Sequence, residues 1–258
     1  MDLGLRGRAV FVAASSRGIG RAIAEQFAIE GADVGLCARR ADELAEAAES
    51  VTAHGVRAVA TVADVGVREQ AHDAVNSAID QLGRLDALVI NTGGPPKGRF
   101  EELGDEDWRT WFNNLFMSGV HLIHAALPRL RRSDAGAILF IASSTVKQQI
   151  PGLTLSNTIR GAVNGLSKTL ANEFAPLVRV NSLLPGAIRT DRQIELARAA
   201  GVTDIEGYFR GIGGRNPLGR IGEPDEVARV AVYLCSPAAS FVTGAAVVVD
   251  GGQIQTVF

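Results

Sequence analysis

Short runs of apolar residues alternate along the chain with segments in which apolar residues recur at helical spacing. The first run, Ala9–Ala13, leads through a turn of small residues into a helical pattern at residues 19–29. Further strands are predicted at residues 33–38, 56–62, 85–90, 137–142, 178–184 and 245–249. Further helices are predicted at residues 41–53, 68–82, 105–131, 155–174 and 225–234.

Regular alternation of strands and helices is typical of an α/β protein with a doubly wound, Rossmann-type parallel sheet. About seven strands are expected, with helices on both faces, and residues 1–258 are predicted to form a single dinucleotide-binding domain. The segment at residues 190–225 interrupts the alternation and is rich in glycine and proline. Since it follows the sixth strand, we expect a substrate lid over the carboxyl ends of the strands; a surface insertion is the alternative.

Composition excludes several classes of partner. The 258 residues carry a net charge of −2 and are only 5% aromatic, which argues against binding of nucleic acid or anionic lipid. No uncharged apolar run approaches the length of a membrane span, so a cytoplasmic protein is expected. Cys37 and Cys235 lie far apart inside apolar segments and are predicted to be buried free thiols.

The turn after the first strand carries the clearest binding signal. A strand, a turn of small residues and a helix N-terminus together present backbone N–H groups and a helix dipole to an anion. A pyrophosphate is the ligand that this turn indicates. The residues predicted to contact it are Ala14, Ser16, Arg17, Gly18, Ile19 and Gly20.

The end of the second strand suggests which dinucleotide binds. An NAD site usually has an acidic residue at this position, whereas this chain has Arg39 and Arg40. Together with Arg17, Arg39 can contact a 2′-phosphate, which favours NADP(H) over NAD(H). The alternative is that these arginines are solvated charges at the start of the next helix.

Several motifs give the chain a resemblance to the short-chain dehydrogenase/reductase family, closest to its β-ketoacyl-carrier-protein-reductase-like branch. In chain order they are Gly18-Ile19-Gly20, Asp64-Val65, Asn91-Thr92-Gly93, Pro185-Gly186-Ala187-Ile188-Arg189-Thr190 and Val249-Asp250-Gly251-Gly252. The resemblance implies that Asp64 and Val65 flank the adenine and that Asn91 and Gly93 line the adenosine side. It also implies that Ile188 and Thr190 contact the nicotinamide half. Ala14 replaces the family's first glycine and is expected to hold a negative φ.

The resemblance also implies an Asn–Ser–Tyr–Lys catalytic set, from which this sequence departs. Ser143 stands in the position of the family's serine. Thirteen residues later Ser156 replaces the tyrosine, and four residues further Arg160 replaces the lysine. The position of the asparagine falls on Leu115, with Asn113 and Asn114 beside it.

These replacements change the chemistry that the site can perform. The Ser156 hydroxyl is shorter and far less acidic than a tyrosine phenol, and Arg160 keeps a positive charge without readily releasing a proton. We therefore expect a non-standard proton donor, either Lys147 on the loop after the fifth strand or water; the alternative for Lys147 is a solvated loop residue. Only two tyrosines exist, and Tyr208, in the predicted lid, is a further candidate, whereas Tyr233 is expected to pack.

The sequence thus predicts an NADP(H)-dependent oxidoreductase that acts on a small-molecule carbonyl/alcohol pair. Ser143 would orient the substrate oxygen and Arg160 would hold the cofactor ribose. A catalytically silent nucleotide-binding homologue and non-redox chemistry in the same pocket are the alternatives. No group of residues has metal-ligand spacing. The helices at residues 105–131 and 155–174 are more apolar than one covered face requires, which favours a homotetramer, with a dimer as the alternative.

Overall fold

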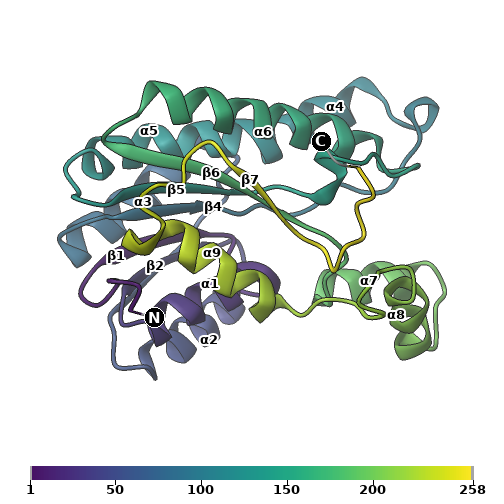
Figure 1. Cartoon of the computed structure of the whole chain (residues 1–258), viewed down its shortest axis with the longest axis horizontal. Coiled ribbons are helices and arrows are strands. Elements are labelled where there is room, and N and C mark those ends of the chain that lie inside the picture. Colours follow the sequence, from purple (N-terminus) through teal and green to yellow (C-terminus); the bar gives the residue numbers. More distant parts are fainter. Residues whose placement is uncertain (1, 257–258) are drawn as a thin grey trace.

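One parallel sheet organises the chain in the computed structural model, which describes residues 2–256 (Figure 1). Its strand order is β3-β2-β1-β4-β5-β6-β7, and every neighbouring pair is parallel. This confirms the predicted Rossmann-type fold. The strands are β1 (Ala9–Ala13), β2 (Asp33–Ala38), β3 (Ala58–Val62), β4 (Ala87–Ile90), β5 (Gly136–Ile141), β6 (Val178–Pro185) and β7 (Ala246–Val249).

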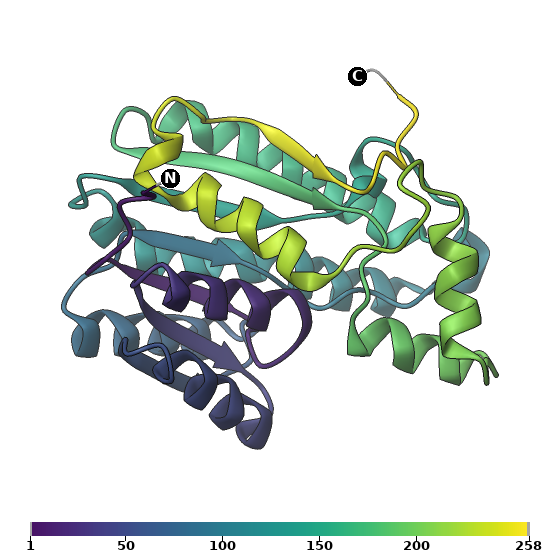
Figure 2. The same cartoon turned by 60° about the horizontal axis from the view of Figure 1, so that its bottom comes forward.

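Helices cover both faces of the sheet, with α1, α2 and α9 on one side and α3, α5 and α6 on the other (Figures 1 and 2). Two shorter helices, α7 and α8, lie together beyond the carboxyl ends of the strands. The helices are α1 (Gly18–Ile29), α2 (Ala41–Thr52), α3 (Arg68–Leu82), α4 (Asp105–Phe112), α5 (Ser118–Leu130), α6 (Thr154–Glu173), α7 (Asp191–Ala199), α8 (Ile205–Gly213) and α9 (Pro224–Cys235).

Burial on both faces explains why the strands are almost continuously apolar. In β1, Val10 and Val12 pack in the cluster beneath α1 and α9, whereas Phe11 packs in the cluster beneath α3 and α5. All three side chains are fully buried. Successive residues of a strand point to opposite faces, so a central strand needs an apolar residue at every position.

Two predicted segments differ from the structure. The helix expected at residues 105–131 consists of α4, a π-helical turn at Asn113–Met117 and α5. The segment at residues 190–225, expected to be irregular, contains α7 and α8. The strand boundaries agree with the predictions to within two residues.

Both cysteines are buried and free, as the sequence predicted. Burial raises the pKa of the Cys37 and Cys235 thiols to about 12. Within residues 2–256, none of the helices combines the length and the apolar character needed to cross a membrane.

Candidate active site

A cleft of about 690 Å³ lies at the carboxyl edge of the sheet. It joins the turn after β1, the ends of β2, β4, β5 and β6, the start of α6 and the first turn of α7. Most of the residues predicted for the site line this cleft. They are Ala14, Ser16, Arg17, Gly18, Ile19, Arg39, Asp64, Val65, Asn91, Gly93, Ser143, Ser156, Arg160, Pro185, Gly186, Ile188 and Thr190.

The turn between β1 and α1 is held in one conformation by close backbone contacts. A Cβ atom added at Gly20 would lie 2.3 Å from the Ala14 carbonyl oxygen and 2.7 Å from Asn91 Nδ2. Asn91 Nδ2 itself donates a hydrogen bond to that carbonyl at 3.1 Å. Only glycine therefore fits at position 20, although it does not itself line the cleft.

Ala14 adopts a φ of 48°, so the expectation of a negative φ was wrong. The carbonyl of Ala14 must lie against Gly20 and Asn91, and this placement requires the left-handed conformation that the family's glycine adopts without strain. Since Gly18 also has a positive φ, of 58°, the turn keeps its glycine-like backbone in spite of the alanine.

The turn leads directly into the N-terminus of a helix. Helix α1 begins at Gly18, and two of its first three residues are glycines, so few side chains cover the N-terminal N–H groups. The preceding residue, Arg17, is extended. These N–H groups and the positive end of the helix dipole favour a phosphate at this end of the cleft.

The two arginines predicted to contact a 2′-phosphate are in different situations. The Arg39 side chain is 76% exposed at the end of β2, with its Nη1 3.9 Å from Asp64 Oδ2. Arg17 instead forms an ion pair with Glu195 on α7. That contact holds the pKa of the Glu195 carboxyl below its usual value. The structure thus leaves Arg39 open to a ligand and joins Arg17 to the predicted lid.

Two serines mark the other end of the cleft. Ser143 follows β5, and its Oγ accepts a hydrogen bond from the Thr145 N–H at 3.2 Å. Ser156 is buried in the first turn of α6. Both residues line the same cleft.

Arg160 lies one helical turn beyond Ser156 and is only 8% exposed. Its Nη1 donates to the carbonyls of Ile141 and Ala142, each at 3.0 Å, and its Nη2 donates to the Gly93 carbonyl at 3.4 Å. Burial, together with the smaller effect of the Arg192 charge, lowers the pKa of the Arg160 guanidinium to about 10. Arg160 thus ties β5 to the loop after β4.

The asparagine counted onto Leu115 is displaced by the π-helical turn. Leu115 is buried against Leu155 and Ile159, whereas Asn114 lines the cleft. Asn113 Nδ2 donates to the Gly66 carbonyl at 3.0 Å. A π-helical turn holds one extra residue, so it changes which side chain faces the site, and spacing alone could not reveal it.

The predicted alternative proton donors do not line the cleft. Lys147 follows the short helical turn Ser144–Val146, and Tyr208 packs against Phe209 on α8 with ring centroids 5.5 Å apart. Tyr233, on α9, was expected to pack but is 36% exposed. The cleft is also lined by three residues that the sequence analysis did not predict: Lys97, Trp111 and Arg192. The only indication of them in the sequence was their location, after β4, in α4 and two residues after Thr190 respectively.

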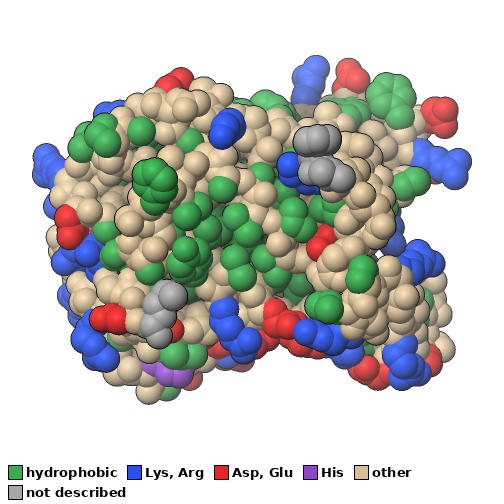
Figure 3. Space-filling model, viewed as in Figure 1, with side chains coloured by type: hydrophobic (Ala, Val, Ile, Leu, Met, Phe, Trp, Pro, Cys, Tyr) green, Lys and Arg blue, Asp and Glu red, His purple; other side chains and the backbone are tan. Residues whose placement is uncertain are grey.

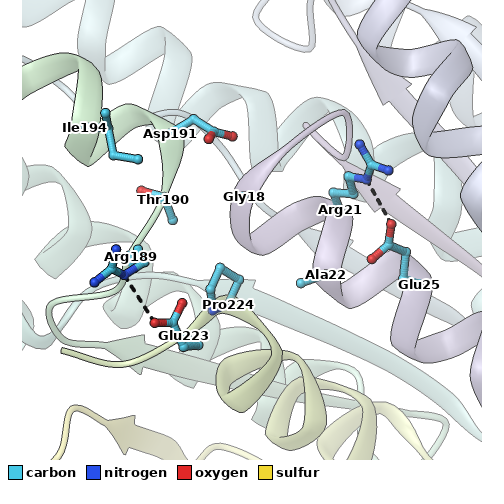
Figure 4. Close-up of a pocket in the computed structure, with 10 residues that line it drawn as sticks. All are labelled: Gly18, Arg21, Ala22, Glu25, Arg189, Thr190, Asp191, Ile194, Glu223 and Pro224. Carbon is cyan, nitrogen blue, oxygen red and sulfur yellow. Dashed lines mark hydrogen bonds and ion pairs between the residues drawn. The ribbon is translucent and has the colours of Figure 1, made fainter. Parts of the chain in front are cut away.

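Charged contacts around Arg189 hold the start of the segment that the sequence predicted as a lid. Its Nη1 and Nη2 contact Glu206 at 2.7 and 2.9 Å, and its Nε lies 3.2 Å from Glu223. The guanidinium also lies 4.6 Å from the centre of the Phe209 ring. Figure 4 shows Arg189 and Glu223 on one side of a smaller groove of about 360 Å³, opposite the ion pair of Arg21 with Glu25. The helices α7 and α8 are therefore anchored to α9 at one end.

The described residues, 2–256, contain no group of three or more His, Cys, Asp or Glu side chains placed to hold a metal ion.

Several known proteins are similar to this chain over most of its length. The family model described as enoyl-(acyl carrier protein) reductase matches residues 13–253. A tropinone reductase homologue of Arabidopsis thaliana is 34% identical over 252 residues, covering 96% of this chain and 76% of the relative. An uncharacterized oxidoreductase of Methylorubrum extorquens is 36% identical over 250 residues, covering 96% and 98%.

Two solved structures are similar in fold as well. L-sorbose reductase from Gluconobacter frateurii, solved with NADPH and L-sorbose, is 35% identical, with a TM-score of 0.95 and 100% coverage of both chains. An NADPH-bound short chain oxidoreductase from Pseudomonas aeruginosa with an atypical catalytic center is 30% identical, with a TM-score of 0.93. That alignment covers 98% of this chain and 99% of the other.

Proposed function

Because this chain belongs to the short-chain dehydrogenase/reductase family of oxidoreductases, we propose that it uses NADP(H) to interconvert a carbonyl compound and its alcohol. The observation that carries the proposal is one cleft that joins a pyrophosphate-binding turn to a pair of serine hydroxyls. Two similar structures bind NADPH, which supports the same cofactor here.

The cofactor would lie along the carboxyl edge of the sheet. Gly18 and Ile19 would contact the pyrophosphate, Asp64 and Val65 the adenine, and Arg39 the 2′-phosphate. The exposed Arg39 guanidinium supports NADP(H) over NAD(H), because an acidic residue at this position would instead bind a ribose hydroxyl. Asn91 and Gly93 would line the adenosine side, and Pro185, Gly186, Ile188 and Thr190 the nicotinamide half.

The bound nicotinamide supplies or accepts the hydride, and the chain's own residues must position the substrate and manage the proton. Ser143 and Ser156 would orient the substrate oxygen through their hydroxyls. Arg160, which already bonds three backbone carbonyls, would hold the nicotinamide ribose. The proton would come from a water between the two serines, from Lys97 or from Lys147, and mutation separates these sources.

The test is oxidation of NADPH by a panel of ketones and aldehydes, followed by its absorbance. Ser143→Ala is expected to lower kcat/KM by roughly 100-fold, because one donor to the developing oxyanion is lost. If either Lys97→Ala or Lys147→Ala lowers kcat/KM by a similar factor, that lysine is the proton donor. Thr169→Ala, at an exposed position of α6, is the matched control and should retain full activity.

Two outcomes would oppose the proposal. Tight NADPH binding without oxidation by any carbonyl would favour a catalytically silent nucleotide-binding protein. Product formation without change in NADPH absorbance would favour non-redox chemistry in the same cleft.

The assembly proposed from the sequence is a homotetramer, with a dimer as the alternative. Phe112, at the end of α4, is 44% exposed and stacks on Phe116 with ring centroids 4.8 Å apart. A second apolar area lies over β7 and α9, where Figure 3 shows hydrophobic side chains gathered on the middle of this face. It includes Val248, which is 37% exposed. The molar mass of Phe112→Glu in solution, measured by light scattering and compared with that of the unmodified chain, tests the first surface. A cytoplasmic location remains a prediction.

A further inference from the structure

Two arginines, one buried and one half-buried, bind the same loop in the cleft. Arg160, on α6, donates to the Gly93 carbonyl, while Arg192, on α7, donates through Nη2 to the carbonyls of Gly94 and Pro95. The Arg192 contact with Pro95 measures 3.3 Å. Both side chains line the cleft, so two positive charges face one cavity beside the serine pair.

Neither charge is neutralised by a neighbouring acid. No carboxylate among residues 2–256 lies within 4.0 Å of either guanidinium. Glu195 has only a longer-range electrostatic effect on Arg192, because its carboxylate forms an ion pair with Arg17. Burial lowers the pKa of both arginines. Each guanidinium is partly or wholly removed from water and has no counterion in the described part of the chain.

Both guanidiniums also keep unused hydrogen-bond donors. An arginine has five N–H groups. Arg160 donates three of them to backbone carbonyls, which leaves two without an acceptor among the described residues. Arg192 donates two, both from Nη2, which leaves three. Backbone carbonyls satisfy hydrogen bonds but do not cancel charge.

Other charged residues also line the cleft. Its acidic lining residues are Asp64 and Asp191, near the end of β3 and at the start of α7. Arg39 and Arg40 lie at the end of β2, where the cofactor's 2′-phosphate is proposed to bind. Arg160 and Arg192 donate to the carbonyls of residues 93–95, and Lys97 follows two residues later, so three positively charged residues of the lining gather at this loop.

We propose that the carbonyl substrate bears a carboxylate, which Arg192 binds next to Arg160 while the two serines hold the carbonyl oxygen. This inference rests on the proposed reductase function and names its substrate class. A keto acid carries an anion within a few bonds of the reacting carbon, which suits a cleft whose lining includes the two serines together with Arg160 and Arg192. Charge-assisted hydrogen bonds supply the recognition.

The first experiment compares benzoylformate and acetoacetate with their methyl esters as substrates for NADPH oxidation. The unmodified enzyme should favour each acid over its ester in kcat/KM. Arg192→Gln should lower kcat/KM for the acids by about 10- to 100-fold, mainly through KM, and leave the esters nearly unchanged. Arg198→Gln, at an exposed position of the same helix, is the control and should change neither. Esters reduced as well as their acids, or an equal loss for both in Arg192→Gln, would overturn the inference.

A second measurement separates a substrate carboxylate from the phosphates of the cofactor. The Kd for NADP⁺, measured by fluorescence quenching, should be the same for Arg192→Gln and for the unmodified protein. A tenfold weaker Kd would mean that Arg192 serves the cofactor, and the inference would be wrong.

The last measurement keeps the inference distinct from the proposed function. Calorimetric titration of benzoylformate into the complex with NADP⁺ needs no turnover. Binding that Arg192→Gln abolishes supports the carboxylate site even if no NADPH is oxidised, in which case only the reductase function fails. Absence of binding to the unmodified complex would overturn the inference even if neutral ketones are reduced.

Discussion

Replacement of Ala14 by glycine is expected to stabilise the protein. With a φ of 48°, Ala14 holds a conformation that costs about 1–2 kcal/mol for a residue with a Cβ atom. Glycine removes this strain but adds about 0.5–1 kcal/mol of chain entropy to be lost on folding. The difference between these two ranges is about 0–1.5 kcal/mol, so the free energy of unfolding should rise by about 0.7 kcal/mol and Tm by about 1–3 °C for a chain of this size.

The prediction depends on the backbone of the turn remaining where it is. The Ala14 carbonyl accepts the hydrogen bond from Asn91 and lies against Gly20, so the turn cannot relax to a negative φ without losing both contacts. Because these contacts persist in the variant, its affinity for NADPH should be equal to or higher than that of the unmodified protein.

The assay is thermal and urea unfolding followed by circular dichroism, together with NADPH titration. Ala13→Gly is the matched control, because Ala13 is fully buried in β1 and glycine there should lower stability. Equal destabilisation by both substitutions would refute the reasoning, since it would mean that the turn gains nothing from a residue without a Cβ atom.

Three further predictions concern charge and burial. Arg39→Ala should weaken NADPH binding by about tenfold and leave NADH binding unchanged in parallel titrations, because a single charge-assisted contact to the 2′-phosphate is lost; equal loss for both cofactors would contradict it. Arg220 lowers the pKa of the Glu226 carboxyl to about 2, so Glu226 stabilises the fold above its usual pKa and loses this effect as the pH falls toward 2. The difference in Tm between Glu226→Gln and the unmodified protein should therefore shrink between pH 5 and about pH 3. Cys37 and Cys235 should stay unreactive toward a disulfide reagent at neutral pH until the protein is unfolded, because both thiols are buried and protonated.

Much of the fold could be predicted from the sequence because the sheet is buried on both faces. A strand such as β1, with every side chain fully buried, leaves an apolar run that periodicity detects directly. The glycine turn was also visible in the sequence. Any Cβ atom at position 20 would meet the backbone, so the fold needs glycine there and the residue type itself marks the turn.

The details of the site depend on contacts between distant segments, which local pattern does not encode. The conformation of Ala14 is set by Asn91, which lies 77 positions away. The π-helical turn exchanged Leu115 for Asn114 at the cleft without altering the apolar spacing of the segment. Arg192 was passed over because its partners, Gly94 and Pro95, are backbone carbonyls 98 and 97 positions away.

The ion pair between Arg17, in the glycine turn, and Glu195, on α7, would make a bound phosphate and α7 compete for one guanidinium. A phosphate that takes Arg17 from Glu195 removes a contact that holds α7 against the turn. By reciprocity, a substrate that stabilises α7 over the cleft must weaken the hold of Arg17 on that phosphate by the same factor. Cofactor and substrate would then bind with negative cooperativity, and each would weaken the equilibrium affinity of the cleft for the other.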